Sequence, residues 1–155
     1  MKIHVLIVED NPDQAELLRY TLAARTEVAF TSEIVATCAE AVERLKLGGI
    51  NAVLLDLSLP DATGIDVIRR IAAVSTDVGI VVLTGWGGPE MARPAKEAGA
   101  DELLTKSHAE PKDISLKLQS VVIHRKFDRD KHDIEAPLAE IGKIIMRSKE
   151  LIERR

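Results

Sequence analysis

The sequence predicts an α/β fold, a doubly wound parallel sheet of five strands followed by one long helix. Short runs dense in Val, Ile and Leu recur along the chain with little polar alternation. Such runs are typical of strands that are buried on both faces. Amphipathic stretches separate them, so that five βα units follow one another. Right-handed crossovers in these units place helices on both faces of the sheet.

The elements can be placed in order along the chain. Strands are expected at 3–8, 31–36, 52–55, 80–83 and 102–105. Helical patterns follow them at 12–25, 38–47, 63–74, 89–98 and from 111 onward. Three of these helices have a proline where a first turn tolerates it, at Pro12, Pro89 and Pro111. Glycines stand where helices are expected to end, at Gly48, Gly49 and Gly99.

Length and composition limit the classes of protein that the chain can represent. Its 155 residues allow one domain of ordinary size and an appendage. The net charge of −4 argues against a surface for nucleic acid or acidic membrane. The single cysteine, Cys38, and His4 in the first strand are expected to be packed core groups, and no apolar run reaches the roughly 20 residues of a membrane span. We therefore expect a soluble cytoplasmic protein with no nucleic-acid or membrane partner.

Polar residues stand at the ends of four predicted strands. Glu9 and Asp10 follow the first strand, Asp56 the third, Thr84 the fourth and Lys106 the fifth. An acidic residue after one strand is usually a turn or a helix cap. In open α/β sheets, however, ligands bind beyond the carboxyl ends of the strands. Because four strands deliver charged or hydroxyl groups to the same edge, the sequence predicts a binding site there.

The residue types at this edge are typical of phosphoryl-transfer chemistry. Three carboxylates in one cleft repel one another, and Mg²⁺ is the usual counter-charge. A carboxylate such as Asp56 can attack phosphorus to form an acyl phosphate. Lys106 supplies a second positive charge and Thr84 a hydroxyl for a phosphate oxygen. The sequence therefore predicts that Asp56 accepts a phosphoryl group.

Four segments resemble the receiver domain of two-component response regulators. They are VEDNP (8–12), LLDLSLPDATG (54–64), VVLTG (81–85) and AGADELLTK (98–106). The resemblance extends over about residues 3–124. It implies a flavodoxin-like sheet with strand order 2-1-3-4-5, and a histidine kinase or phosphotransfer protein as the phosphoryl donor.

The resemblance also implies a role for each residue of the motifs. Asp56 is the phosphorylation site. Asp10 ligates Mg²⁺ directly and Glu9 through water, and the backbone carbonyl of Ser58 completes the protein ligands. Thr84 and Lys106 bind the phosphoryl oxygens.

Three positions depart from the family pattern or vary within it. Leu103 stands where the family usually has the Tyr or Phe of its switch, and Ser107 stands where proline commonly follows the lysine. Signalling through the face of the fourth and fifth strands is therefore in doubt. Trp86 lies at a variable position that tunes dephosphorylation in the family. Its ring either shields the acyl phosphate from water or packs on neighbouring loop residues.

The helical pattern continues from residue 114 to residue 152. Apolar or small side chains recur at heptad spacing in two series, Phe127, Ile134, Ile141, Ser148 and Leu138, Ile145, Ile152. This apolar seam has no predicted element to cover it, and a second copy of the chain is the simplest partner. We therefore expect a receiver domain at 1–124 and an amphipathic helix at 125–155, with homodimerisation through residues 111–155.

The segment HDIEAPL (132–138) is similar to the H-box of histidine kinases. His132 is then a candidate second phosphoacceptor, and the alternative is a solvated histidine on a dimerising helix. No Gly-rich ATP-binding boxes follow it, so the chain is expected not to be an enzyme beyond accepting, and at most slowly losing, its own phosphoryl group.

Several functions fit these observations. A phosphorylated receiver whose output passes through the C-terminal helix is the main prediction. The alternatives are the receiver segment of a hybrid histidine kinase, and a pseudo-receiver that serves only for dimerisation. An aspartate-nucleophile phosphatase is disfavoured, because Ser58 stands where such enzymes have a second aspartate.

Overall fold

The structure is a computed structural model that describes residues 1–25, 27–85 and 89–154, apart from the side chains of 132–136. Five parallel strands form one sheet in the order β2-β1-β3-β4-β5. The strands are β1 (Lys2–Val8), β2 (Ala29–Val35), β3 (Ala52–Leu55), β4 (Gly79–Thr84) and β5 (Glu102–Thr105). The predicted fold class and strand order are confirmed.

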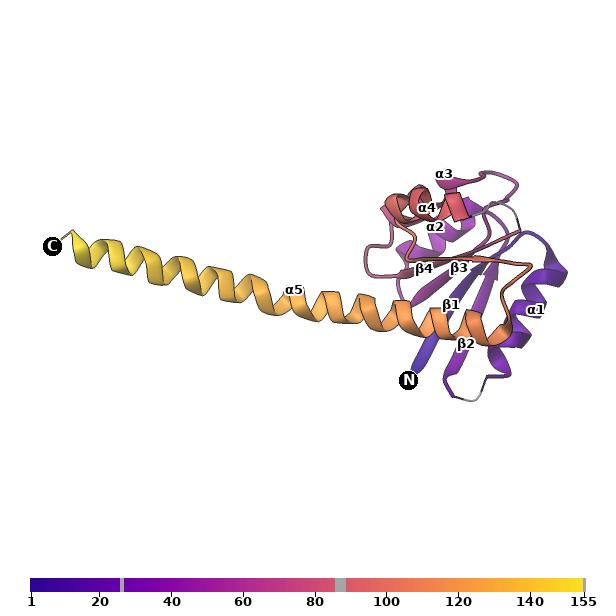
Figure 1. The fold of residues 1–155 in the computed structure, drawn as a ribbon, viewed down its shortest axis with the longest axis horizontal. Coiled ribbons are helices and arrows are strands. Elements are labelled where there is room, and N and C mark those ends of the chain that lie inside the picture. Colours follow the sequence, from indigo (N-terminus) through magenta and orange to yellow (C-terminus); the bar gives the residue numbers. More distant parts are fainter. Residues whose placement is uncertain (26, 86–88, 155) are drawn as a thin grey trace.

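Helices cover both faces of this sheet (Figure 1). They are α1 (Pro12–Ala23), α2 (Cys38–Lys46), α3 (Ile65–Ala73), α4 (Ala92–Ala98) and α5 (Pro111–Glu153). Side chains on one face of the strands pack with α2, α3 and α4, and those on the other face pack with α1 and α5. Within β1, for example, Leu6 and Val8 belong to the first core, and Val5 and Ile7 belong to the second. This alternation explains why the central strands are apolar throughout.

Two helices start later than the sequence pattern predicts. The helix expected from residue 63 begins at Ile65, because Gly64 has φ of +66° and Thr63 forms a β-bridge with Ser58. The helix expected from Pro89 is interrupted: residues Pro89–Met91 form a 3₁₀ turn, and α4 follows it. Both differences arise from local backbone geometry, which apolar periodicity does not register.

The helix α5 has a packed half and a projecting half. It starts with Pro111 in its first turn, and Glu110 and Asp113 form a capping box. Ile114, Leu118 and Val121 are buried against the sheet. Beyond them the helix continues through Pro137 as a rod that extends far from the sheet (Figure 1). None of the described helices is long and apolar enough to cross a membrane.

Arg125 fastens α5 to the sheet at the point where the two halves meet. Its guanidinium binds the Asp101 carboxylate with an Nη2–Oδ1 distance of 3.0 Å. Its Nη1 also donates to the carbonyl of Thr76 at 2.9 Å. Asp101 accepts a further hydrogen bond from the amide of Ile80, at the start of β4. Arg125 thereby connects the helix to the amino ends of β4 and β5.

His4 is not the packed core residue that was expected. Its side chain is 28% exposed, and its ring nitrogens contact Thr31 and Glu33 on the neighbouring strand β2. Glu33 also accepts two hydrogen bonds from Arg44 on α2. These hydrogen bonds, from Arg44 first and His4 second, lower the pKa of Glu33 to about 2. The expectation was wrong because the β1–β2 edge of the sheet holds an ionic network.

Candidate functional site

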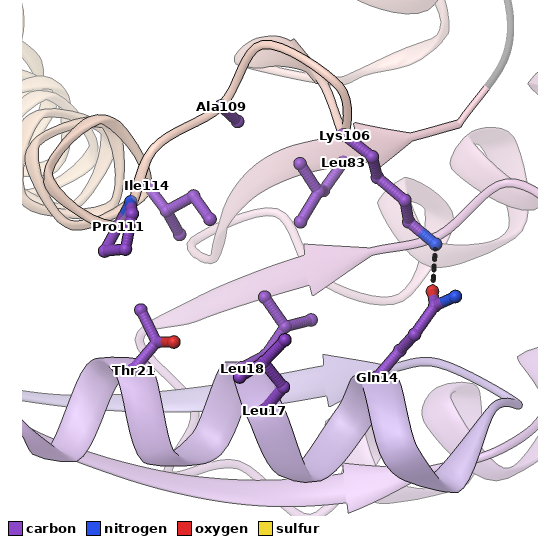
Figure 2. Close-up of a pocket in the computed structure, with 9 residues that line it drawn as sticks. All are labelled: Gln14, Leu17, Leu18, Thr21, Leu83, Lys106, Ala109, Pro111 and Ile114. Atoms are coloured by element: carbon purple, nitrogen blue, oxygen red, sulfur yellow. Dashed lines mark hydrogen bonds between the residues drawn. The ribbon is translucent and has the colours of Figure 1, made fainter.

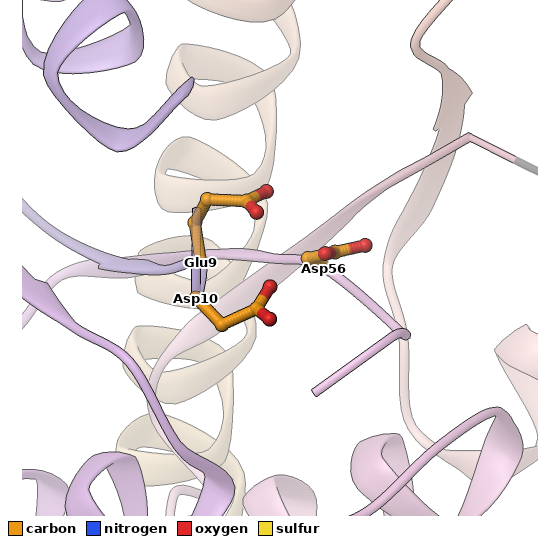
Figure 3. A group of neighbouring side chains, drawn as sticks. All are labelled: Glu9, Asp10 and Asp56. Atoms are coloured by element: carbon orange, nitrogen blue, oxygen red, sulfur yellow. The ribbon is translucent and has the colours of Figure 1, made fainter. Parts of the chain in front are cut away.

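Three carboxylates meet at the carboxyl edge of the sheet. Glu9 and Asp10 follow β1, and Asp56 follows β3, the strand beside it (Figure 3). One oxygen from each side chain lies within 4.8 Å of the others. Glu9 and Asp56 are buried, whereas Asp10 is exposed. The site is thus an acidic cluster with two buried members and one member that faces solvent.

Backbone hydrogen bonds fix these carboxylates relative to the sheet. The Asp56 amide donates to the carbonyl of Val8 at 3.0 Å, and the Glu9 amide donates to the carbonyl of Val35 at 3.0 Å. These bonds extend the ladders β3–β1 and β1–β2 by one residue beyond the strands. The Glu9 side chain also accepts from the amide of Asn11 at 3.2 Å. The acidic residues therefore stand on rigid strand ends.

Lys106 brings a positive charge to the cluster from the other side. Its Nζ lies 3.0 Å from Glu9 Oε2 and 3.7 Å from Asp56 Oδ2. Its backbone amide donates to the carbonyl of Thr84 at 2.8 Å, which continues the β4–β5 pairing past Thr105. Thr84 itself is buried at the end of β4, next to β3. The four predicted strand ends therefore do converge on one edge.

Gln14 of α1 is a further partner of Lys106. Its side-chain oxygen Oε1 accepts a hydrogen bond from Lys106 Nζ at 2.7 Å (Figure 2). This is shorter than either distance from the ammonium to a carboxylate. Asn11 caps α1 by accepting from the amides of Asp13 and Gln14, which fixes the first turn that carries Gln14. The sequence offers no signal for this contact, because a glutamine in a first turn is common.

A groove runs away from Lys106 between α1 and the start of α5. It encloses 390 Å³ and is mostly apolar. It is lined by Gln14, Leu17, Leu18, Thr21, Leu83, Lys106, Ala109, Pro111 and Ile114 (Figure 2). The polar groups of Gln14 and Lys106 stand together at one end, so the groove opens beside the acidic cluster.

The electrostatics of the cluster favour a bound cation. Burial raises the pKa of the Glu9 carboxyl, and the hydrogen bond from Lys106 opposes this shift. One ammonium faces three carboxylates, so the described site keeps an excess of negative charge when all are ionised. Carboxylate oxygens at this separation suit a hard divalent cation such as Mg²⁺. The residues present therefore fit the metal that the sequence predicts.

The loop after Asp56 is held at several points. The Ser58 amide donates to Asp56 Oδ1 at 3.3 Å, and Ser58 itself is exposed. Further along, the two carboxylate oxygens of Asp61 accept from the amides of Cys38 and Ala39, each at 2.9 Å. The amides of Ala39 and Cys38 lower the pKa of Asp61. The loop that bears the predicted metal ligand Ser58 is therefore tied to the N-terminus of α2, a contact that sequence reasoning did not identify.

Other predicted residues lie at the margin of the site or outside the described part. Leu103 is half-buried in β5 and packs against the core that α2, α3 and α4 cover. Cys38 is fully buried, as expected. Trp86 lies outside the described residues, and so does the side chain of His132. The roles proposed for those two residues stay predictions.

Comparisons with known proteins agree with this geometry. Residues 5–118 match the family model of the response regulator receiver domain. Regulatory protein LuxO of Vibrio cholerae is 37% identical over 100 residues, which cover 64% of this chain and 21% of LuxO. The transcriptional regulatory protein TorR of Escherichia coli is 35% identical over 107 residues, covering 68% of this chain and 44% of TorR. The chain thus spans less than half the length of either relative.

A solved structure reproduces the fold. A CheY-like response regulator receiver domain protein from Methanospirillum hungatei superposes with a TM-score of 0.72 at 22% identity, covering 83% of this chain and 99% of that one. At this identity the similarity concerns the fold alone. The family model, in contrast, covers most of the chain and includes every residue of the acidic cluster as well as Lys106. The chain belongs to the response regulator receiver family of two-component signal transduction.

Proposed function

We propose that the chain is a phosphorylation switch in which Asp56 accepts the phosphoryl group. The observation that carries this proposal is the convergence of Glu9, Asp10 and Asp56 within 4.8 Å, with Lys106 Nζ 3.0 Å from Glu9 and 3.7 Å from Asp56. Receiver domains of this family accept phosphoryl groups rather than act as kinases. The acceptor assignment rests on the position of Asp56, which is buried at the end of β3, shares the cluster with Glu9 and Asp10, and lies 3.7 Å from Lys106 Nζ.

The phosphoryl donor is proposed to be a phosphohistidine on a histidine kinase or a phosphotransfer protein. A carboxylate oxygen of Asp56 forms the new O–P bond while the N–P bond of the donor breaks, and the electron pair of that bond returns to the imidazole nitrogen. Charge that builds on the phosphoryl oxygens is met by the Lys106 ammonium and the Thr84 hydroxyl. Lys106 must move from Gln14 or share its hydrogens to reach those oxygens, because its ammonium now contacts Gln14 at 2.7 Å.

The proposed metal ligands are Asp10 and Asp56, the backbone carbonyl of Ser58, and Glu9 through water. Mg²⁺ bound there supplies positive charge to the transferring phosphoryl group. Asp10 is the exposed member of the cluster, so it would hold the cation from the solvent side. Glu9 is buried and already paired with Lys106, so its carboxylate orients the lysine as well.

Phosphorylation can be tested with a matched pair of carboxylate variants. The wild-type protein is incubated with Mg²⁺ and acetyl phosphate, and intact mass reports the added phosphoryl group. Asp56→Asn should take no phosphoryl group. Asp66→Asn should behave as wild type, because Asp66 is a half-exposed carboxylate on α3 paired with Arg70. Equal incorporation in wild type and Asp56→Asn would exclude Asp56 as the acceptor.

Metal binding is tested separately. Fluorescence of the single tryptophan is followed during titration with Mg²⁺ and then beryllofluoride. A saturable response that Asp10→Asn weakens supports the metal site. A wild-type protein that binds no Mg²⁺ and takes no phosphoryl group would instead be a pseudo-receiver.

The output is proposed to pass through the C-terminal helix in a homodimer. We divide the chain into a receiver at 1–124 and an output helix at 125–155, because the buried residues of α5, the last of them Val121, precede this boundary and Arg125 fastens the helix to the sheet at it. The resemblance of 132–138 to an H-box keeps a hybrid-kinase parent as the second candidate, and phosphorylation of His132 stays a prediction. The absence of a nucleic-acid partner also stays a prediction, because the relative TorR is named a transcriptional regulator.

A further inference from the structure

The projecting half of α5 carries an apolar seam that the described part of the chain does not cover. Its members recur at alternating spacings of three and four residues, which brings them to one side of the helix. The described seam positions are Phe127, Lys131, Leu138, Ile141, Ile145, Ser148 and Ile152. The large apolar members are each more than half exposed. We call these residues the α5 seam.

We propose that the α5 seam pairs with the same seam of a second copy, and that the two helices run antiparallel. The inference rests on the homodimer of the proposed function and adds its orientation and register. In this register Phe127 lies opposite Ile152 of the second copy, and Leu138 lies opposite Ile141. The two-fold axis passes near Ala139 and Glu140. Each receiver then stands at an opposite end of a two-helix rod.

The polar members of the seam favour this arrangement over a parallel one. The seam has two described polar positions, Lys131 near its start and Ser148 near its end. In the antiparallel register each Lys131 lies opposite Ser148 of the second copy, so polar meets polar. In a parallel dimer Lys131 would lie opposite Lys131, and two like charges would share one layer of the interface. All described large apolar positions meet apolar partners in the antiparallel register.

The charges beside the seam are complementary only in the antiparallel register. Asp128 and Lys149 both follow a seam residue directly and flank the seam on the same side of the helix. In the antiparallel dimer these flanking positions pair with each other. Asp128 of each copy then lies near Lys149 of the other copy, so the dimer contains two such ion pairs. The other flank carries Asp130 as well as Ile144 and Leu151. The two apolar residues are exposed and extend the apolar face, while Asp130 lies beside Leu151 of the second copy and has no charged partner on this flank.

Within one chain Asp128 and Lys149 cannot interact. They are separated by six helical turns, about 30 Å along the axis. Any energetic coupling between them is therefore a coupling between two chains. This property makes a double-mutant cycle on the pair a direct test of orientation.

The first test reverses the two charges separately and together. Asp128→Lys and Lys149→Asp should each weaken the dimer about tenfold in Kd by analytical ultracentrifugation, because each creates two like-charge pairs. The double variant should return close to the wild-type Kd. Lys143→Asp is the control, since Lys143 lies away from the seam and pairs with Glu140 in its own chain. Losses that add in the double variant would overturn the antiparallel register.

The second test uses disulfide formation. Phe127→Cys and Ile152→Cys chains carrying different tags are mixed and oxidised; the natural Cys38 is fully buried and does not compete. The antiparallel register predicts a disulfide between the two different chains. A disulfide between two Ile152→Cys chains would indicate a parallel dimer and would overturn the proposal.

The oligomeric state of the wild type is also measured at a protein concentration on the order of 50 µM. A monomer at this concentration would overturn the proposal, even if another protein covers the seam. Asp56 phosphorylation is measured on the same samples by intact mass. A monomer that still takes the phosphoryl group would refute the dimer while leaving the switch intact. A normal dimer that takes no phosphoryl group would refute the switch and leave the antiparallel dimer intact.

Discussion

The two halves of α5 share one helical pattern but meet different surroundings. In the first half, Ile114, Leu118 and Val121 are buried against the sheet. In the second half, Leu138 and Ile145 have the same chemistry and are more than half exposed. Amphipathic periodicity therefore predicts only that one face of a helix is apolar and packs against some other surface. Which surface covers that face depends on the rest of the fold, and for the second half the described chain provides none.

The largest expected effect comes from truncating one apolar residue in each half. Leu118→Ala leaves a cavity in a fully buried position and should lower the free energy of unfolding by about 3 kcal/mol in urea titrations. Ile145→Ala removes the same kind of group from an exposed position and should change the stability of the monomer by less than about 0.5 kcal/mol. Equal losses in the two variants, measured at low protein concentration, would contradict the division of α5 into two halves.

The junction between the halves should be sensitive to Arg125. Arg125→Ala leaves Asp101 without its ionic partner in a site where both side chains are less than a third exposed. We expect a loss of about 2 kcal/mol and faster amide exchange at the start of β4. Arg93→Ala is the control, because its pair with Glu97 is on the surface and should contribute less than about 0.5 kcal/mol. If the free energy of unfolding of Arg125→Ala equals that of the wild type, apolar packing alone holds α5 against the sheet.

Two glycines sharpen the comparison between the halves. Replacing each by alanine should change the free energy of unfolding in opposite directions. At Gly142, in the exposed half, an added Cβ would meet no atom within 4 Å, so Gly142→Ala should stabilise the helix by about 1 kcal/mol. At Gly79, the added Cβ would lie 2.6 Å from Val121 Cγ2 in the packed half, and Gly79→Ala should cost about 1 kcal/mol or more. Helicity by circular dichroism and thermal unfolding would check both, and a stabilising Gly79→Ala would contradict the packing described.

The smallest expected effect is a pH dependence confined to the receiver half of the chain. The pKa of Glu33 is lowered to about 2 in the folded protein from an ordinary value of 4.5, chiefly by Arg44. Its contribution to stability is therefore complete above pH 4.5 and is lost as the pH falls through about 2. Glu33 is partly exposed, so the change should be modest. The difference in the free energy of unfolding between wild type and Glu33→Gln should be constant above about pH 4.5 and should shrink as the pH falls toward 2. A difference that does not change with pH would exclude the network as a source of acid sensitivity.

The sequence predicts the fold well because its signals are local and repeated. Continuous apolar strands, first-turn prolines at Pro12 and Pro111, and the helix-ending Gly99 each act within a few residues of the feature that they specify. The boundaries near Gly64 and Pro89 were missed because a positive φ angle and a 3₁₀ turn replace the first helical turn there. Periodicity does not distinguish these from ordinary helix starts.

The candidate site was only partly predictable for a different reason. Residues that follow directly on strands can be placed together once the sheet is known, which is how Asp56 and Lys106 were identified. Gln14 and Asp61 contribute through contacts with distant segments, Lys106 and the start of α2. No short-range pattern specifies such pairs. The same holds for His4, whose partners on β2 become visible only when the strands are paired.

The continuous α5 also acts as a lever arm. From Arg125 to its last turn the helix extends about 40 Å, so a tilt of about 5° at the base would move the far end by about 4 Å. A displacement of that size approaches the spacing of about 5 Å between neighbouring layers of a helical seam, and it is large compared with the movements that a hydrogen bond allows. A rearrangement of a few tenths of an ångström near β4 and β5 would therefore be amplified along the helix and would change the position of its far end relative to a partner.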